Sequence, residues 1–547
     1  QQDFFHHHYN LRSTVDYDEA FHVVGDRDTL YFGSSADDKV YALDASTGRI
    51  RWTFFTQGPI RFAPVVVGDR LYVGSDDGCV YCLDAANGSL MWKRMLASER
   101  RVIPGNGRLI STQPVRTGLV VDDETVYCTA GLFPMQGAWL YALDATDGAV
   151  EWKRKLDISP QGYILLSEDR LYVPTGRTSP AIFNRADGGY LGTLSSAGGA
   201  YALLTDDTLI TGPGRGVKQL HANNVRTKDR FATFGGLRVI VHDSIAYMQS
   251  EAQLSAFDRG TYFALAKDES ELRRKQDNLE KKLKSNPKDK ADLLKQLQDV
   301  KIRIRQVEGR RSDCYLWKVP CAHRRAMILA HDKLLVGGDG SVAAIDARTG
   351  TRMWTAGVEG RAMGLSIING SLVVSTDTGH IHVFKEQTGE ASNDIHPSRM
   401  DNPYPRDDLT PFYTEAADFI ADQLDVDKGY CLVIDSREGR LAYEIVKRTD
   451  MQVIAVETHS ENVATARRML DKAGLYGRVV VHQYSTEDLP YTRHFANLIV
   501  SEESLRTGRA PVNTNRMLDL LRPCGGLLAI GRRVASKRSH GPPIRHG

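Results

Sequence analysis

The chain has 547 residues, which is too long for one ordinary hydrophobic core and indicates two or three domains. Its hydrophobic fraction is 41%, its charged fraction is 25% and its formal net charge is +2, values that are typical of a soluble protein. This balance excludes a general attraction to nucleic acid, and the absence of a long apolar run predicts no membrane-spanning helix. Any partner must therefore be recognised through a local surface.

Cysteine and histidine usage predicts no metal site. Seven cysteines are scattered along the chain and form neither a disulfide framework nor a paired zinc spacing. Cys79 and Cys82 have CxxC spacing, but they lie in an alternating strand pattern in which an odd offset sends the two side chains to opposite faces. The run from His6 to His8 stands at an irregular terminus, where such side chains are usually solvated.

A repeated phrase organises residues 1–395. It reads "VYALDASTGRIRW" from Val40, "VYCLDAANGSLMW" from Val80, "LYALDATDGAVEW" from Leu140 and "VAAIDARTGTRMW" from Val342. Weaker copies lie near Asn184, Asn223, Asp258 and Lys385, so a step of about forty residues gives eight units. Each unit supplies about four short alternating strands separated by Gly and Asp turns, and this pattern predicts an eight-bladed β-propeller.

Each clear copy contains an Asp, a Gly and a Trp at fixed spacing. The Asp side chain can accept hydrogen bonds from amides further along the turn, the Gly can take a positive φ, and the Trp can pack between neighbouring blades. The predicted structural residues are Asp44, Gly48, Trp52, Asp84, Gly88, Trp92, Asp144, Gly148, Trp152, Asp258, Trp317, Asp346, Gly350 and Trp354.

This spacing resembles the tryptophan-docking repeat of the pyrroloquinoline-quinone-type propeller family, which includes quinoprotein alcohol dehydrogenases and the outer-membrane assembly lipoprotein BamB. For a dehydrogenase, the resemblance implies a quinone pocket with calcium ligands, a catalytic Asp and commonly a vicinal Cys pair. None of the seven cysteines is adjacent to another, so pyrroloquinoline quinone is not expected as a cofactor. For a BamB-like protein, the resemblance implies that propeller loops bind protein partners.

Two segments interrupt the repeat. The long step before Asp144 contains the polar loop "SERRVIPGNGRLIST". Residues 267–311 separate Asp258 from Trp317, and their leucines and valines recur at steps of four and three, which predicts a helical hairpin with a coiled-coil seam. This insertion carries 15 Lys or Arg against 9 Asp or Glu, so it is either a solvated charged surface or a docking arm for an acidic partner.

After a Pro-rich and Asp-rich linker at 396–408, the pattern changes to alternating strands and helices over 409–533, followed by a basic tail at 534–547. Helices are expected at 410–424, 439–448, 461–475 and 512–521, and strands at 430–435, 452–458, 478–483, 496–502 and 525–531. This order predicts a doubly wound parallel sheet of the Rossmann type.

The order and several phrases resemble class I S-adenosylmethionine-dependent methyltransferases. In "VIAVETHSENVATAR", Glu457 matches the acid that takes the ribose hydroxyls, and "VVVHQYSTEDLP", with Ser485 and Glu487, resembles the stretch that borders adenine. The three alternate glycines of the family's first turn fall on Asp435, Arg437 and Gly439. By this resemblance the cofactor-binding residues are Gly439, Glu457, Ser485 and Glu487, in a site weakened by two missing glycines and by a Ser where many members carry Asp.

Three functions are compatible with this organisation. The favoured hypothesis is a non-enzymatic, BamB-like scaffold without a catalytic residue, which binds protein partners through its propeller loops and its basic hairpin. The alternatives are a methyltransferase that uses S-adenosylmethionine and recruits its substrate with the propeller, and a quinoprotein dehydrogenase. Export from the cytosol would suit the first and the third, whereas use of S-adenosylmethionine would place the protein in the cytosol.

Overall fold

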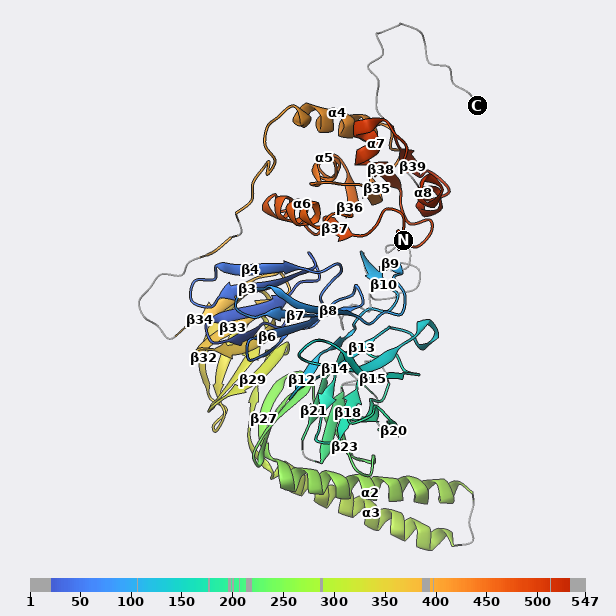
Figure 1. Ribbon diagram of the computed structural model, residues 1–547. Helices are drawn as coiled ribbons and strands as arrows, with labels where there is room; N and C mark the ends of the chain where they lie inside the picture. Colours follow the sequence, from blue (N-terminus) through green and yellow to red (C-terminus); the bar gives the residue numbers. More distant parts are fainter. Residues whose placement is uncertain are drawn as a thin grey trace.

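The computed structural model shows three parts stacked in Figure 1, with a helical hairpin below a β-propeller and a C-terminal sheet domain above it. His6 to His8 and the basic tail lie outside the described residues. The described residues are 21–531 without 106, 176–177, 195–197, 199–200, 206, 213–218, 286–288, 386–393, 397 and 512.

Six four-stranded antiparallel sheets follow one another and form six blades of the propeller. The first three blades are β1 (Val24–Asp26), β2 (Thr29–Gly33), β3 (Lys39–Asp44) and β4 (Ile50–Phe55); β5 (Val65–Val67), β6 (Arg70–Gly74), β7 (Cys79–Asp84) and β8 (Leu90–Met95); and β12 (Val120–Asp122), β13 (Thr125–Ala130), β14 (Trp139–Asp144) and β15 (Val150–Lys155). The next three are β17 (Leu165–Leu166), β18 (Arg170–Val173), β19 (Ala181–Asn184) and β20 (Tyr190–Thr193); β21 (Tyr201–Leu204), β22 (Thr208–Gly212), β23 (Gln219–Asn224) and β24 (Arg230–Gly235); and β25 (Arg238–His242), β26 (Ile245–Gln249), β27 (Gln253–Asp258) and β28 (Tyr315–Pro320).

The seventh blade is a six-stranded sheet, so the prediction of eight separate blades is wrong for the described residues. Its strands are β29 (Ala326–Ala330), β30 (Lys333–Gly337), β31 (Asp339–Asp346), β32 (Arg352–Ile368), β33 (Ser371–Thr376) and β34 (Ile381–Phe384). The strand β32 runs on without a break, pairing first with β31 and then with β33. The last two sequence repeats therefore share one sheet.

The ring closes between its first and last sheets. Val23 and Leu30 pack with Ile368 and Val373 in one buried cluster, and the hydroxyl of Ser366 donates to the carbonyl of Val23. Between the third and fourth blades, the short parallel pair β11 (Thr117–Gly118) and β16 (Gly162–Tyr163) adds a backbone contact. Apolar side chains between neighbouring sheets, rather than backbone pairing, supply most of the remaining closure.

The hairpin is formed by α2 (Arg259–Lys284) and α3 (Lys290–Ser312), which are inserted between β27 and β28. The helix α2 begins before Lys267, where the sequence pattern placed the start of the insertion, because the carboxylate of Asp258 caps it by accepting the amide of Thr261 at 2.8 Å. Tyr262 and Leu265 in its first turns are buried against the fifth blade. No helix in the described part of the chain is long and apolar enough to cross a membrane.

A five-stranded parallel sheet with helices forms the C-terminal domain. Its elements are α4 (Leu409–Asp422), β35 (Lys428–Ile434), α5 (Arg440–Val446), β36 (Asp450–Glu457), α6 (Ser460–Lys472), β37 (Val479–Gln483), β38 (Leu498–Ser501), α7 (Glu502–Thr507), α8 (Thr514–Leu520) and β39 (Leu527–Ala529). The strand order is β37-β36-β35-β38-β39. Both faces of the sheet are covered, because separate buried clusters join one face to α4, α5 and α6 and the other to α8.

The polar loop before Asp144 folds into a hairpin that belongs to both domains. Its strands are β9 (Val102–Gly105) and β10 (Arg108–Ser111). Val102 donates its amide to the carbonyl of Pro490 at 2.8 Å and accepts the amide of Thr492 at 2.9 Å, while Val102 and Leu109 are buried in the core of the C-terminal domain. The propeller therefore supplies part of that core, and the two domains form one packed unit.

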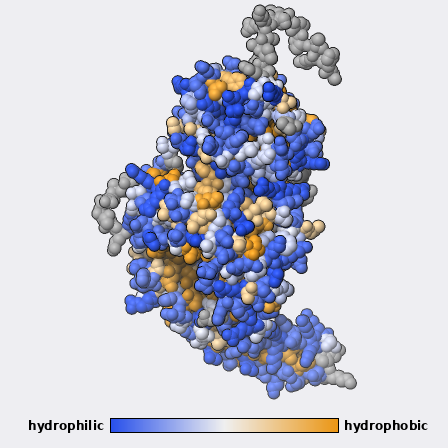
Figure 2. Space-filling model, viewed as in Figure 1, coloured by the Kyte–Doolittle hydropathy of each residue, from blue (hydrophilic) through white to orange (hydrophobic). Residues whose placement is uncertain are grey.

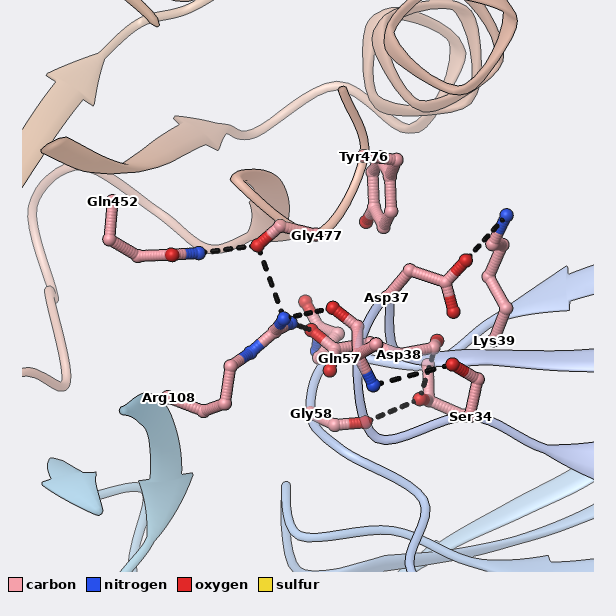
Figure 3. Close-up of polar contacts among 12 residues, drawn as sticks. Ser34, Asp37, Asp38, Lys39, Gln57, Gly58, Arg108, Gln452, Tyr476 and Gly477 are labelled. Carbon is pink, nitrogen blue, oxygen red and sulfur yellow. Dashed lines mark hydrogen bonds and ion pairs between the residues drawn. The ribbon is translucent and has the colours of Figure 1, made fainter. Parts of the chain in front are cut away.

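Charged groups complete the domain contact (Figure 3). Arg108 donates to the carboxylate of Asp38 and to the carbonyl of Gly477 at 3.1 Å, and the ammonium of Lys39 lies 2.6 Å from the carboxylate of Asp471. Burial raises the pKa of Asp38 to about 6, although Arg108 opposes this shift. A recess of ≈ 450 Å³ lies beside these contacts, between residues 34–37 of the propeller and residues 474–478.

The two additions to the propeller lie at its opposite faces. In a four-stranded blade, the second-to-third connection and the link to the next blade leave at one end, and the third-to-fourth connection leaves at the other. The C-terminal domain contacts the β2–β3 connection, where Gly477 packs against Ala36, and the β4–β5 connection, where Gln483 donates its amide to Gln57; the hairpin instead joins β27 to β28. Figure 1 shows this separation, with the sheet domain above and the hairpin below.

Candidate functional site

The candidate site is the turn between β35 and α5, at the carboxyl ends of the parallel strands. The neighbours of β35 in the sheet are β36 and β38, and the order of strands reverses between β35 and β38. In open parallel sheets, ligands bind in the crevice outside the carboxyl ends of the strands at such a reversal. Glu457 ends β36 and Ser501 ends β38, so their side chains flank this turn.

The backbone of the turn has positive φ at three alternate positions, and only one of them is glycine. Asp435, Arg437 and Gly439 all have positive φ, at 54°, 45° and 83°. These are the three alternate positions at which the resemblance places glycine, and each side chain held in this region costs of order 1 kcal/mol or more. At Gly439, an added Cβ would lie 3.2 Å from the Cβ of Ala466 and 3.3 Å from the hydroxyl of Tyr404, so the turn is closely covered there.

The carboxylate of Glu457 is engaged by donors of the protein itself. One oxygen accepts the amide of Arg437 at 2.8 Å, and the other accepts the amides of Thr458 and His459 at 2.9 Å and the His459 imidazole at 3.0 Å. Burial alone would raise the pKa of Glu457, but these hydrogen bonds outweigh burial and leave the pKa below its usual value. Glu457 is therefore an ionised acceptor whose oxygens already have partners.

The side chain of Arg437 crosses the carboxyl end of β35. Its amide is bound to Glu457 on one side, and its guanidinium donates to the carboxylate of Glu503 at 2.9 and 3.3 Å on the other. Asp435 accepts the hydroxyl of Ser501 at 3.1 Å, and burial raises the pKa of Asp435, with added repulsion from Glu457 and Glu503. These bonds tie β36, the turn and α7 together across the carboxyl end of β35.

Sequence analysis did not identify the buried acid beside this turn. Glu502 is 1% exposed and accepts a hydrogen bond from the hydroxyl of Tyr413. Burial raises the pKa of Glu502 to about 8, so the carboxyl is largely protonated at neutral pH. The sequence did contain a local signal for the helix that carries Glu502. Ser501 is a typical N-cap residue, and in the structure its hydroxyl accepts the amide of Ser504 at the start of α7, directly after β38.

The linker also contributes to the site, which the sequence pattern did not indicate. The hydroxyl of Tyr404 donates to the carbonyl of Glu438 within the turn at 2.8 Å, and Tyr404 is 8% exposed. Next to it, the guanidinium of Arg440 donates to both carboxylate oxygens of Asp407 at 2.8 and 2.9 Å. Residues 401–408 thus lie over the start of α5 and close the turn from outside.

Ser485 and Glu487, the predicted adenine-side residues, are exposed in the loop after β37. The hydroxyl of Ser485 accepts the amide of Glu487 at 3.3 Å, and the carbonyl of Glu487 accepts the side-chain amide of Asn513 at 3.1 Å. This loop is connected to the end of β36 by the hydroxyl of Thr458, which donates to the carbonyl of Tyr484 at 3.3 Å. The structure therefore places Gly439 in the turn and Glu457 beside it, bound to the amide of Arg437, whereas Ser485 and Glu487 lie in an exposed loop.

The repeat acids form the blade turns. Asp44, Asp84, Asp144 and Asp346 each accept backbone amides from the second and third residues that follow. Gly48, Gly88, Gly148 and Gly350 in the same turns have φ values of 68°, 73°, 70° and 74°. Asp258 differs, because its carboxylate caps α2 instead.

The repeat tryptophans lie on glycines of the next blade. A Cβ placed at Gly88, Gly148, Gly188 or Gly350 would come within 2.8 Å of the rings of Trp52, Trp92, Trp152 and Trp317, respectively. The indoles of Trp52, Trp92 and Trp317 donate to the carbonyls of Ala85, Ala145 and Ala347 at 3.1, 3.1 and 2.9 Å. Trp354 is 38% exposed and contacts the ring of Phe384 at 5.1 Å.

Within the described ranges, no three His, Cys, Asp or Glu side chains come together in a way that could hold a metal ion. Cys79 and Cys82 are free and belong to two different hydrophobic clusters, on the two faces of their strand.

Comparison with known proteins connects the chain to one family. A family model described as outer membrane protein assembly factor BamB matches residues 12–103, 97–212 and 325–486. No curated protein sequence matches the chain. Among solved structures, BamB from Moraxella catarrhalis is 16% identical, with 67% of this chain and 81% of that chain covered and a TM-score of 0.33. The quinohemoprotein alcohol dehydrogenase ADHIIG from Pseudomonas putida HK5 is 12% identical, with 74% and 80% covered and a TM-score of 0.43.

A computationally designed protein, Ika8, is 10% identical, with 68% of this chain and 97% of that chain covered and a TM-score of 0.46. Because the three matched ranges of the family model span more than half of the 547 residues, the chain belongs to the family described as outer membrane protein assembly factor BamB.

Proposed function

We propose that this protein is a non-enzymatic propeller scaffold that binds protein partners, and that its C-terminal domain has a cofactor turn closed by its own side chains. The observation that carries the proposal is the double connection made by Arg437, whose amide binds Glu457 and whose guanidinium binds Glu503. Membership of the BamB family supports the scaffold role of the propeller.

We further propose that the C-terminal domain is of the Rossmann type and related to class I methyltransferases. Its strand order supports this relation: numbered along the domain, the strands lie in the order 3-2-1-4-5 across the sheet. The first turn with three positive φ values and the acid at the end of the second strand are further points of likeness. The relation explains the unusual backbone of Asp435 and Arg437, which keep a loop geometry suited to glycine.

S-adenosylmethionine does not fit the turn as it stands. Side chains at Asp435 and Arg437 occupy space where backbone would have to approach the ligand, and the Asp435 carboxylate would face the carboxylate of the amino-acid moiety. Ribose hydroxyls would also have to compete for Glu457 with four donors at 2.8 to 3.0 Å. No methyl-transfer step is therefore assigned to this site.

The experiment is titration calorimetry of the full chain with S-adenosylmethionine. We expect no binding tighter than about 1 mM, which corresponds to less than roughly 4 kcal/mol of binding free energy. Asp435→Gly combined with Arg437→Gly should tighten binding, because this change frees the space above the turn and removes a carboxylate. Adding Glu457→Ala should remove the gain.

A methyltransferase is the second candidate function, and the position of Glu457 beside the turn is the observation that favours it. Micromolar binding of S-adenosylmethionine by the unmodified chain, lost in Glu457→Ala, would establish the cofactor site and overturn the scaffold proposal. Circular dichroism of each variant shows whether a change in binding reflects the turn or a loss of folding.

A further inference from the structure

The helical hairpin is anchored at its base and free along the rest of its length. In α2, Tyr262, Leu265 and Ala266 pack into the core of the fifth and sixth blades. Beyond this base, Leu279, Leu293, Val300 and Ile304 form a separate small cluster between the two helices. The outer part of the hairpin is therefore held by its own seam, and Figure 1 shows it extending below the propeller.

The side of α3 that faces away from this seam presents two aliphatic side chains. Leu294 is 49% exposed and Ile302 is 47% exposed. At 100° per residue, Leu294, Lys295, Gln298, Ile302 and Arg305 fall within about 100° of one another around the helix, on the side away from Val300 and Ile304. We name these five exposed residues the outer face of α3.

The outer face of α3 carries positive charge and no carboxylate. Two acids of α3 have partners on the hairpin itself: Glu308 binds Arg273 at 2.6 Å, and Asp292 accepts the side-chain amide of Gln296 at 2.7 Å. In the described part of the chain, Lys295 and Arg305 form no ion pair. In Figure 2 the hairpin surface is mostly hydrophilic, with apolar side chains set among charged ones.

We propose that the outer face of α3 binds an acidic amphipathic helix of a partner protein. This inference rests on the proposed scaffold function and adds the surface and the chemistry of the partner. Leu294 and Ile302 are about 12 Å apart along the helix at about 1.5 Å per residue, a spacing that matches apolar positions on the face of a second helix. Lys295 and Arg305 beside them select glutamate or aspartate at the flanking positions of that helix.

An anionic membrane is the competing occupant, and the outer face fits it less well. A helix that lies in a membrane interface needs a broad apolar face, commonly with Trp or Phe, which enters the acyl region. The outer face of α3 contains two aliphatic residues and no aromatic ring, while the other apolar side of the helix is used against α2. A narrow apolar stripe flanked by basic groups is better suited to a single acidic helix.

The test uses the full chain and a synthetic peptide of three Leu-Glu-Glu-Leu-Glu-Glu-Glu heptads, labelled for fluorescence anisotropy. We expect binding with a dissociation constant of tens of micromolar at low salt, weakened at least about tenfold near 1 M salt. Leu294→Ser combined with Ile302→Ser should weaken it about tenfold or more, and so should Lys295→Glu. Replacing residues 281–300 by a short Gly-Ser turn should abolish it.

The matched control is Lys281→Glu, which makes the same charge change at an exposed lysine of α2. The variants are compared at about 0.15 M salt, where charges on the surface are screened beyond about 8 Å, and we expect Lys281→Glu to change the affinity less than about twofold. Equal loss in Lys281→Glu and Lys295→Glu, or equal binding of a scrambled peptide of the same composition, would reduce the interaction to general charge attraction and overturn the proposal.

Vesicles of phosphatidylcholine with about 30% phosphatidylserine provide the other arm. Binding to these vesicles without binding to the peptide would assign the surface to a membrane and overturn the proposal. No binding to either probe would also overturn it, whereas the result of the S-adenosylmethionine titration would stand unchanged. A failure of this proposal can therefore be told apart from a failure of the proposed function.

Discussion

The contact between Trp92 and Gly148 allows a direct test of how neighbouring blades are joined. The indole of Trp92 is 8% exposed, lies on Gly148 of the next blade and donates to the carbonyl of Ala145 at 3.1 Å. Trp92→Ala empties this site and should lower the free energy of unfolding by roughly 3 to 5 kcal/mol, the usual range for a buried aromatic residue.

Gly148→Ala should damage the same contact from the other side. The new Cβ would lie 2.6 Å from the Trp92 ring, and φ at this position is 70°. Displacement of the ring should cost about 1 to 3 kcal/mol, and the positive φ should add about 1 kcal/mol. In a Trp92→Ala background only the second cost remains, so the two changes should combine with a coupling of about 1 to 3 kcal/mol.

The matched control is Gly68→Ala, at a blade turn with φ of 61° and nothing within 4 Å of the added Cβ. It should cost about 1 kcal/mol and show no coupling to Trp92→Ala. The assay is native-state hydrogen exchange of the β7 and β14 amides, which reports opening of these two blades without assuming that the whole chain unfolds in one step. Additive costs for Trp92→Ala and Gly148→Ala, or a Gly68→Ala cost equal to that of Gly148→Ala, would refute the account.

Two further predictions concern the C-terminal domain. Gly477→Ala should loosen the contact between the domains, because the added Cβ would lie 2.6 Å from the carbonyl oxygen of Ala36. Faster hydrogen exchange in β9, β10 and β37 would show this effect. The control is Gly525→Ala, whose Cβ has nothing within 4 Å and which should leave this exchange unchanged. The pKa of Glu502 is raised from 4.5 to about 8, so the folded chain binds this proton more tightly than the unfolded chain does. The free energy of unfolding should therefore fall as the pH rises from about 4.5 to about 8, by at most about 1.4 kcal/mol per pH unit. The variant Glu502→Gln keeps an acceptor for Tyr413, and its melting temperature should fall less between pH 5 and pH 8 than that of the wild type. An equal dependence of the two melting temperatures on pH would contradict the assigned pKa.

The sequence predicted the repeating part of the molecule well because its signals are local. The Asp and Gly of each clear copy are close enough along the chain to fold into one turn, and alternating apolar residues favour strands with one face toward the next blade. The same reasoning failed at the last blades, because nothing in the local pattern near Arg361 indicates that β32 continues and joins two repeats in one sheet.

The candidate site was predicted in part. The chain pattern placed Glu457 at the end of a strand and Gly439 in the turn before the next helix, and in the structure Glu457 accepts the amide of Arg437 from that turn. Glu503 and Tyr404, which close the turn, come from a later helix and from the linker, and their contacts depend on tertiary packing that no spacing in the sequence expresses.

By itself, the sequence determined much of the local geometry of this protein: the blade turns with Asp and positive-φ Gly, the amphipathic arms of the hairpin, and the succession of strands and helices after residue 408 with the exception of α7. Only the tertiary structure decided what each piece contacts. The loop that contains Arg108 looked like a polar excursion of one blade, yet Val102 and Leu109 complete the core of the C-terminal domain. Burial of such side chains depends on surfaces that are hundreds of residues away in the chain, so no local pattern predicts it. The periodicity of helices and strands depends on neighbouring residues, so the sequence does predict it.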